Sequence, residues 1–175
     1  KLIMHHETGN FLTNLKNNLI SDFCSQNSIE LIEYQSNGVV RDLKNRDGWS
    51  KLWNSVMYKP VLKEPDISKL MKISNLSVND SILKIGHNFK GYKKTFYGGE
   101  QRALNTLDSF LSNRGNFYSK EMSSPVTAPN SCSRLSSYIT YGNISIRQIF
   151  HETKIKQKYL RENKVRTGWL KSLSS

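Results

Sequence analysis

Hydroxyl, thiol and guanidinium side chains gather between Ser131 and Ser136, and this segment is the one best suited to binding chemistry. The pattern predicts a helix that begins near Ser133. The first N–H groups of a helix lack partners inside it and lie at the positive end of its dipole, so an anion is favoured there. Ser136 adds a hydroxyl and Arg134 a charge, which together suit a phosphate. The alternative is that Ser133 simply caps the helix while Arg134 points into water, and local evidence alone favours it because serine caps are common.

A second candidate is a basic stretch near the C-terminal end of the sequence. Its members are Lys154, Lys156, Lys158, Arg161, Lys164, Arg166 and Lys171, opposed only by Glu152 and Glu162. A helix with these side chains on one face could contact a phosphodiester backbone. The alternative is a solvated helix face, or a helix whose partner lies beyond Ser175, and we favour this alternative because no base-reading motif accompanies the charges.

Other common kinds of site are not indicated. Cys24 and Cys132 lie far apart and match neither a disulfide framework nor a zinc module. His5 and His6 are adjacent, so on a strand they would face opposite sides and could not share a metal ion. Neither a Ser/His/Asp arrangement nor a Walker loop can be assembled. Gly98 and Gly99 are expected to let the chain turn into a helix, and not to form a phosphate-binding glycine loop.

Composition narrows the classes of partner. The 175 residues contain 26 Lys and Arg against 14 acids, a net charge of +12. This excess favours an anionic partner: nucleic acid, a phosphate-bearing ligand or an acidic membrane surface. Apolar residues make up 37%, enough for a core. The sequence has no apolar run long enough to cross a bilayer and no signal-peptide pattern at its start, so we expect a soluble, cytoplasmic protein. A first residue other than Met is typical of a piece of a longer polypeptide.

The first part of the sequence has the pattern of an α/β layer. Residues 2–4 and 29–34 are expected to form strands, and apolar residues at helical spacing predict a helix over 12–23 between them. A further helix is predicted from Trp49, with Asp47 as its N-cap. Prolines, serines and asparagines over 60–94 indicate a long connector.

The second part has the pattern of helices alone. One helix is predicted from Glu100 to about residue 113, and another from Ser133 to Gly142. The prolines at 125 and 129 indicate a loop between them. Ser145 is expected to cap a third helix that carries Ile146, Ile149 and Phe150.

Several short motifs follow one another in a distinctive order. They are Phe96-Tyr97-Gly98-Gly99-Glu100, Ala103-Leu104, Phe110-Leu111, Tyr118, Ser133-Arg134-Leu135-Ser136-Ser137-Tyr138 and Tyr141-Gly142-Asn143-Ile144-Ser145-Ile146-Arg147-Gln148, preceded by His6-Glu7-Thr8-Gly9-Asn10, Gly38-Val39-Val40-Arg41 and Arg46-Asp47-Gly48-Trp49. Together they resemble the DNA photolyase/cryptochrome family in its bacterial form, over nearly the whole chain.

The resemblance implies a division of the chain. Residues 1–40 would be the end of an α/β antenna domain with a parallel sheet, 41–95 an interdomain linker, and 96–175 the opening helices of an all-α domain that binds FAD. The resemblance also implies which residues hold the flavin's phosphate and ribitol portion. These are Tyr118, Cys132, Ser133, Arg134, Leu135 and Ser136, with Cys132 where threonine is usual.

What the resemblance implies for function is light-driven repair of UV-damaged DNA, with reduced FAD giving an electron to a pyrimidine dimer. The protein would be a deoxyribodipyrimidine photo-lyase and a monomer. The 175 residues alone would be inactive and would bind FAD weakly or not at all, because most of the cavity wall would be absent. A folate or deazaflavin antenna pigment is also implied, although Lys16-Asn17 replaces the usual Arg-Asp pair, and Met122 stands where an arginine often helps to hold DNA. Two alternatives stay open: a cryptochrome-type photoreceptor and a cofactor-free basic nucleic-acid-binding module.

Overall fold

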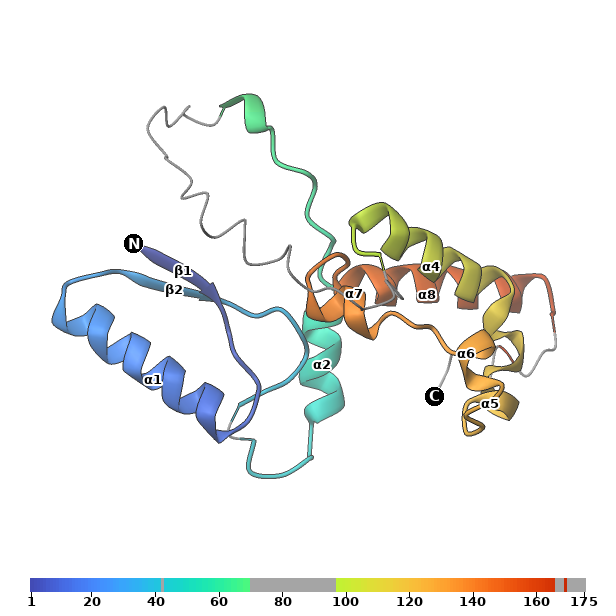
Figure 1. Cartoon of the computed structure of the whole chain (residues 1–175), viewed down its shortest axis with the longest axis horizontal. Helices are drawn as coiled ribbons and strands as arrows, with labels where there is room; N and C mark the ends of the chain where they lie inside the picture. The colour runs from blue at the N-terminus through green and yellow to red at the C-terminus, as the bar shows by residue number, and fades with distance from the viewer. Residues whose placement is uncertain (42, 70–96, 166–168, 170–175) are drawn as a thin grey trace, which may run out of the picture.

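The chain begins with a strand, a helix and a second strand in the computed structural model, which describes residues 1–41, 43–69, 97–165 and 169 (Figure 1). Strand β1 (Leu2–His5) pairs in parallel with β2 (Leu31–Tyr34), and α1 (Phe11–Gln26) connects them. The side chain of Asn10 caps α1 by accepting hydrogen bonds from two backbone amides of its first turn. The predicted strand–helix–strand order is therefore confirmed.

The apolar stripe of α1 is largely exposed, although its spacing is the feature that predicted the helix. Leu12 is 68% exposed, Leu19 61% and Phe23 59%. An open hollow of about 410 Å³ lies along this stripe and the side chain of Leu2. The stripe is thus not covered by the other described residues. Cys24 is one of the residues of α1 that are buried.

Helix α2 (Trp49–Met57) begins where it was predicted but is not capped by Asp47. Gly48 is the N-cap, in the left-handed conformation at φ 73°, and no side chain caps the helix. Glycine adopts this conformation without the steric cost that a Cβ would bring. The predicted cap is therefore wrong, while the predicted helix is confirmed.

Helix α2 and the segment that follows it both contact the second, helical part of the chain. Trp53 of α2 lies edge-on to Phe150 with ring centroids 5.2 Å apart, and His151 forms a hydrogen bond with the carbonyl oxygen of Lys59. Residues 60–66 have no regular structure and lead to a short 3₁₀ helix, η1 (Ile67–Lys69). The rest of the predicted connector, 70–94, lies outside the described residues.

The second part contains helices of very different lengths. They are α4 (Glu100–Ser112), the 3₁₀ helix η3 (Arg114–Phe117), α5 (Tyr118–Glu121), α6 (Ala128–Ser131), α7 (Ser136–Thr140) and α8 (Ile146–Glu162). Gly99, at φ 109°, turns the chain into α4 as predicted. Ser145 caps α8 as predicted, because its hydroxyl accepts a hydrogen bond from the amide of Gln148. The prediction of a loop around Pro129 is corrected, since α6 forms there.

The core of this part joins α4, α7, α8 and the last described residue. Its buried members are Ala103, Leu107, Leu111, Leu135, Tyr138, Ile144, Leu160 and Trp169. Burying a large apolar side chain stabilises a fold by about 1.5–3 kcal/mol, so this cluster stabilises the helices on either side of residues 132–135. Within the described ranges, no helix combines the length and the apolar character needed to cross a bilayer.

Candidate functional site

The loop between α6 and α7 does not have the form that the sequence predicted. The helix begins at Ser136, with Leu135 at the N-cap and no side chain capping it. Arg134 takes the left-handed conformation at φ 60°, which is uncommon for a residue with a Cβ. The prediction of a helix start near Ser133 is therefore wrong, and so is the alternative that Ser133 is its cap. Because α7 has only five residues, its dipole cannot be the main attraction for an anion.

The loop nevertheless exposes the polar groups that the prediction named. Ser136 is exposed and Ser133 is half-buried, and neither hydroxyl has a hydrogen-bond partner among the residues that the structure describes. Arg134 is exposed and donates from Nη1 to the carbonyl oxygen of Pro129 over 3.2 Å. Cys132 is half-buried with a free thiol. The hydroxyls of Ser133 and Ser136 and the thiol of Cys132 therefore remain available to a ligand.

Leu135 is buried, unlike Arg134 and Ser136 on either side of it. Only 3% of its surface is exposed, and it packs in the core with Tyr138 and Leu107. Its side chain therefore anchors the loop to the core and leaves ligand contact to the residues on either side.

Tyr118, the first residue of α5, is half-buried and lies edge-on to Phe110, with ring centroids 6.0 Å apart. Two contacts join its helix to α6: the hydroxyl of Ser131 donates to the carboxylate of Glu121, and Thr127 Oγ1 donates to the carbonyl oxygen of Glu121 over 3.2 Å. Tyr118 and the loop thus belong to neighbouring elements. No direct polar contact joins the Tyr118 side chain to the loop within the described parts of the chain.

Arg114 is the residue that sequence analysis missed. It stands at the start of η3, and its guanidinium donates to the carbonyl oxygens of Cys132 at 2.6 Å and Ser133 at 3.2 Å. Burial lowers the pKa of Arg114, and the nearby charge of Arg134 lowers it further. In the sequence, Asn113-Arg114-Gly115-Asn116 indicated only the end of a helix, so no local signal pointed to this role.

The basic residues of α8 are mostly engaged with their own helix. The ammonium groups of Lys154 and Lys156 each lie 5.3 Å from an aromatic ring centroid, of Phe150 and Tyr159 respectively. Lys158 pairs with Glu162 over 3.8 Å. These contacts favour the interpretation of a solvated face. Arg166 and Lys171 lie outside the described residues.

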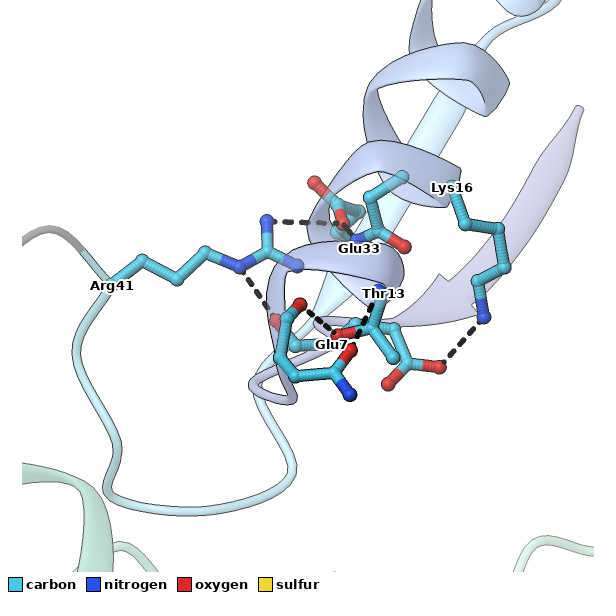
Figure 2. Close-up of polar contacts among 7 residues, drawn as sticks. Glu7, Thr13, Lys16, Glu33 and Arg41 are labelled. Carbon is cyan, nitrogen blue, oxygen red and sulfur yellow. Dashed lines mark hydrogen bonds and ion pairs between the residues drawn. The ribbon is translucent and has the colours of Figure 1, made fainter.

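A polar cluster that the sequence did not indicate lies beside the two strands (Figure 2). Asn17, only 6% exposed, donates from Nδ2 to Glu33 Oε1 over 3.3 Å. Arg41 Nη1 lies 4.0 Å from the same carboxylate oxygen, and Arg41 Nε donates to the carbonyl oxygen of Glu7 over 2.6 Å. Lys16 pairs with the carboxylate of Glu7. Since both acids are paired with bases, we interpret the cluster as a tie between the sheet and the segment that leaves it.

Other features of the described residues offer no stronger site. No group of three or more His, Cys, Asp or Glu side chains that could hold a metal ion is found in these parts of the chain. An open hollow of about 600 Å³ lies between residues 61–65 and the start of α8, and none of the predicted site residues lines it. The loop over 132–136, with Arg114 behind it, therefore stays the best candidate.

Comparison with known proteins does not assign this chain to a family. No protein-family model matches the chain, and no curated protein matches it.

Proposed function

We propose that this sequence belongs to a flavin-dependent protein of the photolyase/cryptochrome type, in which the loop over 132–136 holds the diphosphate of FAD. The observation that carries the proposal is that two free hydroxyls, of Ser133 and Ser136, and the guanidinium of Arg134 lie together on the loop over 132–136. The guanidinium of Arg114 stands behind this loop and donates to its carbonyl oxygens. Hydrogen bonds to charged groups are stronger than those between neutral groups, so such a loop suits a diphosphate. The order of the sequence motifs supports a flavin as the bearer of that diphosphate.

Each residue of the proposed site would contribute to FAD binding in a different way. Ser133 and Ser136 would donate hydroxyl hydrogens to phosphate oxygens, Arg134 would neutralise their charge, and Leu135 would fix the loop by its buried side chain. Tyr118 would complete the site from α5. When bound, reduced FAD would supply the light-driven electron that splits pyrimidine dimers in UV-damaged DNA. The net charge of +12 supports DNA as the substrate, because a basic surface attracts the phosphodiester backbone.

Cytoplasmic location, a monomeric state and repair activity are parts of the same proposal. Repair separates the two flavin-containing alternatives: a photolyase removes dimers from an irradiated oligonucleotide under blue light, whereas a cryptochrome-type photoreceptor binds the flavin without repairing DNA. The experiment uses the full-length product of the gene that encodes this sequence, purified in the dark. Denaturation releases bound flavin, and chromatography identifies it.

The decisive variant combines Ser133→Ala with Arg134→Ala. A hydrogen bond to a charged group contributes about 1.5–3 kcal/mol, so the double variant should bind FAD at least about tenfold more weakly. A control variant, Ser123→Ala with Arg102→Ala, removes the same chemical groups from exposed positions outside the loop. FAD content that equals that of the unaltered protein in both variants would count against the assignment.

The remaining alternative is a nucleic-acid-binding module without a cofactor, and the charge of +12 is the observation that favours it. In that case no flavin would be released on denaturation, while the protein would still bind DNA with an affinity that falls steeply as salt is raised. The same purified protein therefore distinguishes all three functions.

A further inference from the structure

The side chain of Arg114 links the end of α4 to the candidate loop. Its Nε donates to Ser109 Oγ over 2.9 Å, and Nη2 donates to the carbonyl oxygen of Thr106 over 3.1 Å, both on α4. The remaining bonds reach the carbonyl oxygens of Cys132 and Ser133, 18 and 19 residues further along the chain. One guanidinium thus uses its fixed fork of donors to hold the loop at a set distance from the helix.

These bonds determine which way the loop amides face. In a planar trans peptide the carbonyl oxygen and the following N–H point in opposite directions. The carbonyls of Cys132 and Ser133 point toward Arg114, so the N–H groups of Ser133 and Arg134 point away from it. Two backbone donors are therefore directed to the side of the loop opposite Arg114.

Among the residues that the structure describes, no carboxylate lies within hydrogen-bond distance of Arg114 to balance its charge. Its four hydrogen-bond acceptors are one hydroxyl and three carbonyl oxygens, all uncharged. Its pKa is lowered by burial and then by the like charge of Arg134. Arginine begins from so high a pKa that the group remains protonated near neutral pH. Two positive charges therefore act on the same loop, and an anion bound there would relieve their repulsion.

We propose that Arg114 is a positioning residue for diphosphate binding: it orients the backbone donors of the loop and adds positive potential without touching the ligand. This inference rests on the proposed function, and it deepens it by assigning the selectivity for the phosphate-bearing part of the flavin to a residue behind the loop. Selectivity between FAD and riboflavin, which lacks phosphate, should then depend on Arg114.

The test compares the two flavins on the full-length, flavin-free protein and on its Arg114→Lys variant. Lysine keeps the charge but cannot donate to three carbonyl oxygens and a hydroxyl at once. We expect FAD binding to weaken about tenfold or more, as for the loss of hydrogen bonds to a charged group, while riboflavin binding is unchanged. Ser109→Ala, which frees only Nε, should weaken FAD binding in the same direction and by less.

A matched control is Arg41→Lys. Arg41 also donates to a backbone carbonyl oxygen, that of Glu7, but it follows β2 and contacts the strand–helix–strand unit instead of the loop over 132–136. It should leave both flavin affinities unchanged. Equal weakening of FAD and riboflavin by Arg114→Lys would show that Arg114 only supports the fold and would overturn the inference.

Other outcomes separate the inference from the proposal on which it rests. If the unaltered protein binds FAD and both Arg114→Lys and Ser109→Ala bind it equally well, the positioning role is wrong while the proposed function stands. If the unaltered protein binds neither flavin, the proposed function fails, and the inference fails with it. If Arg114→Lys does not fold, Ser109→Ala decides, because it leaves the guanidinium in place.

Discussion

The contact between Gly115 and Trp169 gives the sharpest prediction for stability. Gly115 is buried in η3, and a Cβ added there would lie 2.5 Å from Trp169 Cζ2 and closer still to Cη2 and Cζ3. Carbon atoms pack best at about 3.5–4.0 Å, so the indole ring would have to move by about 1 Å or more. The ring has little freedom to do so, because it is 1% exposed and lies edge-on to Phe110 with centroids 5.0 Å apart.

The substitution Gly115→Ala should lower the free energy of unfolding in two ways. Overpacking a core costs about 1–3 kcal/mol. Moving the ring also weakens the hydrogen bond from Trp169 Nε1 to the carbonyl oxygen of Leu111, and a bond of this kind contributes about 0.5–1.5 kcal/mol. We therefore expect the free energy of unfolding to fall by about 2–4 kcal/mol. Urea denaturation followed by circular dichroism should show a lower midpoint with the same slope.

Two comparisons control this prediction. Gly98→Ala places a Cβ 3.4 Å from its nearest neighbour at an exposed position, so it should change stability by less than about 0.5 kcal/mol. Trp169→Leu removes the ring atoms that the new methyl group would meet, and in that background Gly115→Ala should cost much less. The reasoning would be refuted if Gly115→Ala left the urea midpoint unchanged, or if it cost the same with and without the indole ring.

Two further changes test local features of the fold. Ser145→Ala removes the acceptor for the amide of Gln148 and should lower the free energy of unfolding by about 1 kcal/mol; an unchanged urea midpoint would show that the cap contributes nothing. Glu33→Ala leaves the buried amide of Asn17 without its partner and should cost about 1–3 kcal/mol in thermal or urea unfolding. Glu30→Ala, which removes an exposed carboxylate from the same region, should cost less than about 0.5 kcal/mol, and equal effects of the two changes would contradict a role for burial.

Much of the fold could be predicted because its signals are local. The cap at Ser145 and the glycine before α4 each act within a few residues of the element they start. The two strands and α1 follow from spacing and turn residues in the same way. What packs on an apolar stripe is not a local property, so the exposure of Leu12 and Leu19 could not be predicted from spacing alone.

The polar residues of the candidate site are visible in the sequence, but the form of the loop that carries them is not. Ser133 looks like a cap because serine precedes helices so often, yet the left-handed turn at Arg134 delays the helix to Ser136. That turn is accompanied by bonds from Arg114 to carbonyls 18 and 19 residues away. Contacts between residues so far apart in the sequence leave no recognisable pattern in a single sequence. The contact of Arg114 with the loop therefore could not be predicted.

The placement of the two cysteines makes the loop accessible to chemical labelling. Cys24 is 2% exposed within α1, whereas Cys132 is half-buried in the loop, and the sequence has no other cysteine. Of these two thiols, a polar maleimide reagent should therefore modify Cys132, beside the serines, and spare Cys24. The rate of that modification reports directly on whether something occupies the loop, without any need for the occupant to be coloured, fluorescent or known in advance.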